Sequence, residues 1–166
     1  MVLDLKKDLE CLQGKNEFKN YKNENSDSYL CAAFTILEPS KKKRWQIDYY
    51  SPKSDKMTAF LIDPIFERKD CNTLHKDNEK IHELNIDNID IGIDDTLNIV
   101  TSLKDKSYSN EKVSKIIVIL QNINKKEIWN ITYLTESFHV LNVHIDAQSG
   151  ELLKEKFENI LSFNAH

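Results

Sequence analysis

The chain twice shows the alternation of apolar and polar residues that is typical of a β-strand with one buried face. Residues 45–49 read Trp-Gln-Ile-Asp-Tyr, and residues 129–133 read Trp-Asn-Ile-Thr-Tyr. Each motif belongs to the middle one of three predicted strands, which span residues 29–37, 44–50 and 57–63 in the first half and residues 115–120, 128–134 and 138–146 in the second. We therefore predict two three-stranded antiparallel meanders.

The spacing of the two motifs predicts an internal repeat. The offset of 129 − 45 = 84 residues also places residues 32–36 over residues 116–120 without a gap. Shortening the second turn by one residue aligns residues 60–63 with 143–146. Self-similarity at a fixed period over three strands favours a duplication. The alternative is chance similarity between two isoleucine-rich meanders, since aromatic residues are common in strands anyway.

Apolar residues at helical spacing precede each meander and also follow the second one. Asp4 is the expected N-cap of a helix over residues 2–13, and Asp94 or Asp95 is the expected cap of a helix that begins near residue 93. A third helix is predicted over residues 151–161. The apolar faces of the three helices consist of Leu5, Leu9 and Leu12, of Leu97, Val100 and Leu103, and of Leu152, Leu153, Phe157, Ile160 and Leu161.

These elements predict an α+β fold, in which a helix followed by a three-stranded antiparallel meander occurs twice in tandem and a C-terminal helix ends the chain. The expected units are residues 1–64 and residues 93–166. Residues 65–92 form a charged linker, whose middle, residues 72–84, has some helical character. The polar stretch at residues 15–28 has little apolar surface and is expected to be a mobile loop.

Composition narrows the choice of partners and cofactors. The 166 residues carry 23 basic and 27 acidic side chains, for a net charge of −4, which disfavours binding to a phosphate backbone. Only 3 glycines are present, and none forms a glycine-rich phosphate loop. The 3 cysteines are too few and too irregularly spaced for a disulfide framework. We expect no nucleic-acid partner and no cofactor.

The sequence shows neither a signal peptide at its start nor an apolar run long enough to span a membrane. The expected location is therefore the cytoplasm for the chain as it stands, or outside the cytoplasm if a leader has been removed.

The second half resembles the PepSY domain. Residues 91–100 correspond to the opening helix of that family, and residues 143–153 (VHIDAQSGELL) correspond to its closing strand and turn. Asp146, Ala147, Gly150 and Glu151 match the closing motif, while Ser149 replaces the usual threonine. The resemblance covers residues 90–154, and the first half would be a degenerate second copy that lacks the glycine. It implies a non-catalytic module that binds or inhibits peptidases, generally outside the membrane.

Candidate chemistry is sparse. Cys71, His75 and His82 would share one face of a helix and are the weak candidates for a zinc site, although their spacing is not a known metal motif. An acidic cluster before the second helix lacks the spacing of a calcium loop. We predict no catalytic, cofactor or metal residues, and hence no enzyme.

Three functions compete on this basis. The leading hypothesis is a non-enzymatic binding or regulatory module, in which the exposed face or edge of a meander holds a peptide or protein partner. The second is an acidic cytosolic protein of immunity or chaperone type that masks a basic partner. The third is a pocket for a small ligand, or an uncharacterised enzyme, between the sheet and its helices, with His75, Cys71 or His82 at its mouth. The oligomeric state is left open.

Overall fold

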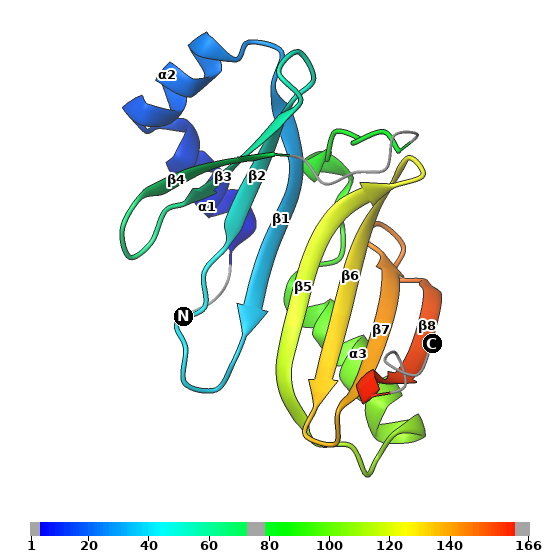
Figure 1. Cartoon of the computed structure of the whole chain (residues 1–166). Coiled ribbons are helices and arrows are strands. Elements are labelled where there is room, and N and C mark those ends of the chain that lie inside the picture. Colours follow the sequence, from blue (N-terminus) through cyan, green and yellow to red (C-terminus); the bar gives the residue numbers. More distant parts are fainter. Residues whose placement is uncertain (1–3, 73–78, 162–166) are drawn as a thin grey trace.

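The computed structural model describes residues 4–72 and 79–161 and shows an α+β fold built on a single antiparallel sheet (Figure 1). The eight strands lie in the order β4-β3-β2-β1-β5-β6-β7-β8. They are β1 (Tyr29–Leu37), β2 (Gln46–Ser51), β3 (Lys56–Leu61), β4 (Glu67–Asn72), β5 (Val113–Ile123), β6 (Lys126–Thr135), β7 (His139–Asp146) and β8 (Leu152–Asn159). The helices of this part of the chain are α1 (Leu5–Gln13), α2 (Asn16–Glu24) and α3 (Ile93–Ser107), with a 3-10 turn, η1, at Ile86–Asn88.

Each half of the chain contributes a four-stranded meander, and the two meanders are joined between β1 and β5. Six residue pairs form this junction, from Ala32 opposite Gln121 to Leu37 opposite Ile116. All neighbouring strands in the sheet are antiparallel. The sheet is therefore continuous from one edge to the other.

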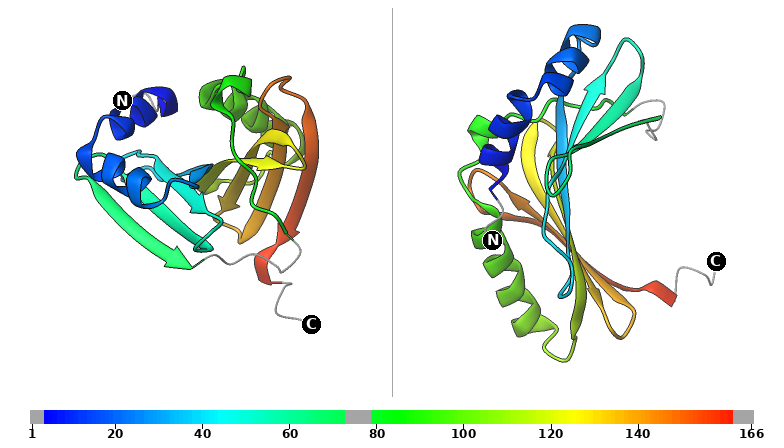
Figure 2. Two further views of the ribbon diagram at one scale, coloured as in Figure 1. Left: turned by 90° about the horizontal axis from the view of Figure 1, so that it is seen from above. Right: turned by 90° about the vertical axis from the view of Figure 1, so that its left-hand side faces the viewer.

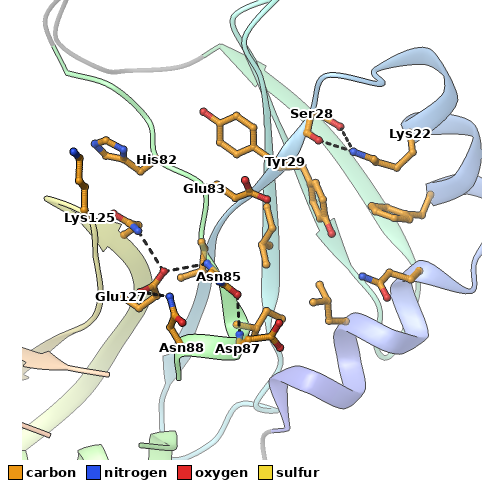
Figure 3. A pocket seen from close by; sticks show the side chains of 18 residues that line it. Lys22, Ser28, Tyr29, His82, Glu83, Asn85, Asp87, Asn88, Lys125 and Glu127 are labelled. Atoms are coloured by element: carbon orange, nitrogen blue, oxygen red, sulfur yellow. Dashed lines mark hydrogen bonds between the residues drawn. The ribbon is translucent and has the colours of Figure 1, made fainter. Parts of the chain in front are cut away.

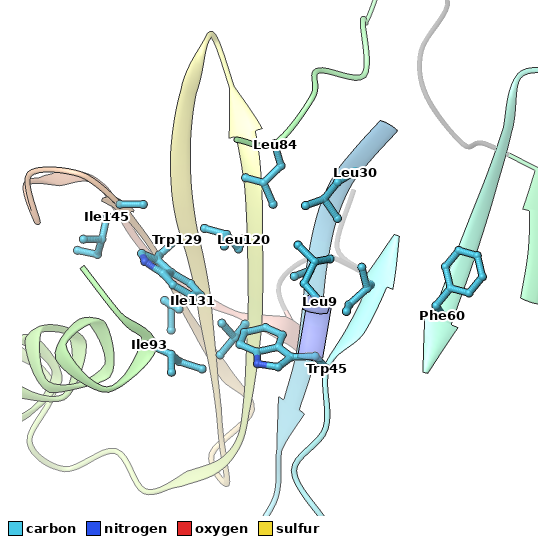
Figure 4. Close-up of a cluster of buried hydrophobic side chains, with 14 of the residues drawn as sticks. Leu9, Leu30, Trp45, Phe60, Leu84, Ile93, Leu120, Trp129, Ile131 and Ile145 are labelled. Atoms are coloured by element: carbon cyan, nitrogen blue, oxygen red, sulfur yellow. The ribbon is translucent and has the colours of Figure 1, made fainter. Parts of the chain in front are cut away.

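All three helices lie on the same face of the sheet, as both views in Figure 2 show. Alternate residues of the central strands point to this face and form the core, in which Ile47, Val118, Leu120 and Ile131 are fully buried. Figure 4 shows Leu120 and Ile131 in one cluster with Leu9 of α1 and Ile93 of α3. No helix within the described residues is long and apolar enough to cross a membrane.

The prediction of a helix and three-stranded meander in tandem, closed by a C-terminal helix, is wrong. Residues 67–72, assigned to the linker, pair with β3 as a fourth strand. Residues 152–159, predicted as helical, pair with β7 as the last strand. Both segments are edge strands rich in charged residues, and such strands lack the apolar alternation by which strands are recognised in a sequence. The eight strands form one sheet, to which each half of the chain contributes four strands and not three.

The alignment with an offset of 84 residues is also wrong for the first strand of each half. It places Ala33 over Ile117, but Ala33 lies opposite Ile47 while Val118, not Ile117, lies opposite Ile131. A β-bulge between Leu30 and Ala32 accompanies this difference of one residue. Because side chains alternate between faces, a shift of one residue exchanges the buried and the exposed sets.

The first predicted helix is confirmed, and two neighbouring expectations fail. The Asp4 carboxylate accepts a hydrogen bond of 3.1 Å from the Lys7 amide, as an N-cap should. The polar stretch expected to be a loop contains α2, because Phe18 and Tyr21 lie one turn apart and both are buried against the sheet. The N-cap of α3 is Gly92, which makes no side-chain bond, and the two expected caps lie in the first helical turn.

The helix expected at residues 72–84, in the middle of the linker, is absent from the described part of that range. Residues 73–78 lie outside the described residues, and residues 79–85 have no regular structure. This segment is nevertheless fixed in place, because Leu84 is buried in the core and its amide donates a 2.8 Å hydrogen bond to the Leu30 carbonyl. The Tyr29 hydroxyl also donates to the Ile81 carbonyl.

Candidate functional site

The face of the sheet opposite the helices carries no helix of the described residues. In the right-hand view of Figure 2 the ends of the strands curve away from the helices. The uncovered face is therefore concave along the strand direction. Strand pairing assigns alternate residues to it. We refer to it below as the open face; its central side chains are those of Gln46, Asp48, Ala32, Phe34, Ile36, Ile117, Ile119, Asn130, Thr132, Asn142 and His144.

The centre of the open face is apolar. Phe34 lies opposite Ile119, and Ile36 lies opposite Ile117, at the junction of β1 and β5. All four side chains are partly exposed to solvent. Sequence reasoning did not single them out. The available signal was the unbroken apolar run at residues 116–120, which indicates apolar residues on both faces of a strand.

One flank of the open face is a row of hydrogen-bonded polar side chains. The side-chain amide of Asn142 on β7 donates to Asn130 Oδ1 at 2.7 Å and to the Thr132 hydroxyl at 2.9 Å, both on β6. Next in the row is His144, opposite Lys154 of β8. Burial lowers the pKa of His144, and the Lys154 ammonium group lowers it further, so the imidazole is neutral at pH 7.

On the other flank, a carboxylate and a thiol are nearly buried. The Gln46 amide donates a 2.9 Å hydrogen bond to the Asp48 carboxylate. Burial raises the pKa of Asp48, and that hydrogen bond partly opposes the increase. Burial also raises the pKa of the Cys31 thiol to about 12. Cys31 is therefore protonated at neutral pH and is not a nucleophile.

A polar cleft of about 780 Å³ lies on the helix side, between α1, α2 and residues 82–88 (Figure 3). Its best-anchored group is the buried carboxylate of Glu127. This carboxylate accepts hydrogen bonds from the Asn85 amide nitrogen at 3.2 Å and from the side chains of Asn122 at 3.3 Å and Asn88 at 3.4 Å. Because its oxygens are engaged in this way, Glu127 fixes the connection between β4 and α3 to the sheet.

Two of the three weak metal candidates, Cys71 and His82, lie within the described residues. Cys71 is exposed near the end of β4 and donates to the Met57 carbonyl. His82 lines the polar cleft, whereas Cys71 does not. His75 lies outside the described residues. Within residues 4–72 and 79–161, no group of three His, Cys, Asp or Glu side chains is close enough to hold a metal ion, and this includes the acidic residues before α3.

One cluster contains the residue types of a hydrolase but not the geometry. Ser137 Oγ lies 2.9 Å from His139 Nδ1, and Glu111 Oε1 lies 3.3 Å from the same nitrogen. In a serine hydrolase the nucleophile and the carboxylate use opposite nitrogens of the imidazole ring. The Ser137 hydroxyl also donates to Glu111, and the His139 ring stacks on Phe157 at 4.9 Å. The cluster thus anchors the turn between β6 and β7 against β8.

The closing motif of the PepSY resemblance forms the turn between β7 and β8. Asp146 Oδ1 accepts hydrogen bonds from the amides of Gln148 at 2.8 Å and Ser149 at 3.1 Å. Gly150 has a φ of 78°, which a residue with a side chain adopts only under strain. Ala147 is fully buried, and its carbonyl accepts from the Asp90 and Ile91 amides. Asp146, Ala147 and Gly150 therefore have structural roles in this turn.

Comparison with known proteins adds to the description of the fold. No protein-family model matches the sequence, and no curated protein matches it. A crystal structure of a protein from Clostridium difficile 630, described as a candidate lipoprotein, is similar with a TM-score of 0.57 and 14% identity, covering 86% of this chain and 91% of that chain. Similarity at this level of identity shows a shared fold alone, and the relation to the PepSY domain stays a prediction.

Proposed function

We propose that the chain is a non-enzymatic binding module that holds a protein partner on the open face of its sheet. The observation that carries the proposal is an eight-stranded sheet with helices on one face only and partly exposed apolar side chains at the centre of the other. Apolar side chains gathered on an uncovered surface are typical of interaction sites.

The dimensions of the open face support a protein rather than a small ligand. Eight strands spaced ~4.8 Å apart, with a mean length of 8 residues at ~3.3 Å per residue, give a face of roughly 34 by 26 Å, or ~900 Å². One partner in a standard-size protein interface contributes ~800 Å². An apolar centre between polar rows is also the usual anatomy of such an interface.

The charges on the open face favour a partner without a strong charge of its own. Lys69 pairs with Glu67 at 3.8 Å, and Lys156 pairs with Glu158 at 2.8 Å. These two pairs are neutralised within the chain, and the Asp48 and Lys154 side chains on the same face are of opposite sign, so the face offers little electrostatic steering. The proposed partner is therefore a folded protein whose contacting surface is apolar at its centre and polar, but close to neutral, at its rim.

Position-specific photo-crosslinking tests the proposal. Phe34 is replaced by p-benzoylphenylalanine on the open face, and Asn98, which is exposed on α3, is replaced in a control. Both variants are irradiated in cells that naturally produce the chain. We expect a discrete protein adduct from position 34 and none of the same mass from position 98. An adduct common to both positions, or adducts from position 98 alone, would contradict the proposal.

A further inference from the structure

The two edges of the sheet differ in what a second copy of the chain would meet there. β4 and β8 lie at opposite ends of the strand order, and no described segment pairs with the outer edge of either strand (Figure 1). An edge strand presents backbone N–H and C=O groups that can pair with the edge of another molecule. The side chains that such a pairing brings opposite each other decide whether it is stable.

The backbone of β8 alternates between bonding to β7 and facing outward. The Ile160 amide donates a 2.8 Å hydrogen bond to the Phe138 carbonyl, in register with the β7–β8 ladder. Because hydrogen-bonded pairs alternate along an antiparallel ladder, the backbone groups of the even-numbered residues from 154 to 158 face β7. Those of Glu155 and Phe157 face outward and are placed to bond to a second strand.

One register of pairing between two copies of β8 is complementary in charge. A twofold axis through Phe157, perpendicular to the sheet, sets Lys156 of each copy opposite Glu158 of the other. Both side chains point to the open face, where they already pair within the chain at 2.8 Å. The register therefore creates two equivalent ion pairs and places no like charges directly opposite each other. An axis through Glu155 instead would set Glu155 opposite itself and Lys154 opposite Lys156.

Exposed apolar side chains lie at both ends of the same pairing. Leu153 is 41% exposed, and Leu161 is 63% exposed. They stand four residues before and four residues after Phe157, so the twofold axis sets Leu153 of one copy beside Leu161 of the other. The burial of their apolar surface favours the pairing.

The opposite edge of the sheet offers no equivalent register. Residues 67–70 of β4 read Glu-Arg-Lys-Asp, an unbroken charged run. An axis through any of them sets that charge opposite itself, which is destabilising. An axis through Cys71 sets Asp70 opposite Asn72 and creates no ion pair among the described residues. The charge pattern thus favours self-pairing at β8 and disfavours it at β4.

We propose that two copies of the chain pair antiparallel along the outer edges of β8, with Phe157 at the twofold axis. The dimer then contains one continuous sheet of 8 + 8 = 16 strands. Because the axis is perpendicular to the sheet, the open faces of the two copies lie side by side on the same surface. The pairing uses the strand edge and does not depend on the function proposed for the open face.

Sedimentation equilibrium and amide hydrogen exchange of the full chain test the proposal. We expect the mass to rise from that of a monomer to that of a dimer with concentration, and a monomer at every concentration up to ~1 mM would overturn the proposal. In the dimer, the amides of Glu155 and Phe157 should exchange at least ~10-fold more slowly than in dilute solution. A dimer in which the exchange of both amides is unchanged would pair through another surface, and would equally overturn the proposal.

A charge exchange across the axis tests the register. Lys156→Glu and Glu158→Lys each set like charges opposite each other twice, and each should weaken dimerisation at least ~10-fold. The double variant re-forms both ion pairs with reversed polarity and should restore dimerisation. The matched control exchanges Glu67 and Lys69 on β4, which pair at 3.8 Å, and should leave dimerisation unchanged. A double variant as weak as the single ones, or an equal loss from the β4 exchange, would overturn the assigned register.

Discussion

The two faces of β5 carry the same type of residue in different surroundings. Val118 and Leu120 point to the helices and are fully buried, whereas Ile117 and Ile119 point to the open face and are partly exposed. The helices cover Val118 and Leu120. Nothing among the described residues covers Ile117 and Ile119, so the comparison separates apolar side chains that stabilise the fold from apolar side chains available to a partner.

The largest expected effect is a difference in stability between these neighbouring positions. Leu120→Ala should lower the free energy of unfolding by ~2–5 kcal/mol, because it leaves a cavity in a closely packed core. Ile119→Ala should cost less than about 1.5 kcal/mol, since solvent already reaches that side chain. Urea unfolding followed by circular dichroism measures both. Equal losses would mean that the open face is part of the core.

A second prediction concerns the polar contacts that join the helix side to the sheet. Trp129→Phe removes the donor to the Ile91 carbonyl, just before α3, and should cost ~1–3 kcal/mol more than Trp45→Phe, which breaks no hydrogen bond. The two changes remove the same ring atoms, so each serves as the control for the other. Thermal unfolding of both variants measures the difference, and the reverse order of stability would contradict the prediction.

A smaller effect is expected from the polar row on the open face. Asn142→Ala removes the hydrogen bonds to Asn130 and Thr132 and should lower stability by ~0.5–1.5 kcal/mol. The matched control is Lys154→Ala on the neighbouring strand, which should change stability by less than ~0.5 kcal/mol because exposed side chains contribute little. The prediction fails if both variants unfold at the same urea concentration.

The smallest predicted effect depends on pH. Burial raises the pKa of Asp48 in the folded chain, so the folded state binds a proton more tightly than the unfolded state does. Stability should therefore fall as the pH rises from the ordinary aspartate pKa of 3.8 through the raised value. Asp48→Asn should be more stable than the unchanged chain at pH 7 and should match it near pH 3. A loss of stability at pH 7 would show that the carboxylate is favourable where it lies.

Strands with a conventional pattern were predictable from the sequence, and edge strands were not. The range 29–37 is confirmed as β1, because apolar side chains fill it and turn-forming residues bound it. In β8 only Phe157 packs against the core, so Leu152 and Leu153 gave a misleading helical spacing. The pairing that makes β8 a strand is a contact with β7, which local periodicity does not contain.

The sequence predicted the type of candidate site, but not the residues that form it. Alternation on β2 and β6 indicated a sheet with one wet face, and this led to the hypothesis of binding on an exposed face or edge. The apolar residues at the centre of that face belong to β1 and β5, which the sequence separates by about 80 residues. Their meeting depends on the junction of the two meanders, and for that reason neither Phe34 nor Ile119 could be identified in advance.

The most direct test of binding on the open face is an affinity ratio measured with a partner identified by crosslinking at position 34. Ile119→Lys places a charge at the apolar centre of the face, and Asn98→Lys places the same charge on exposed α3. Isothermal titration should show at least ~100-fold weaker binding for Ile119→Lys, which corresponds to about 2.7 kcal/mol, and unchanged binding for Asn98→Lys. Equal affinities for the two folded variants would contradict the assignment of the open face as the binding surface.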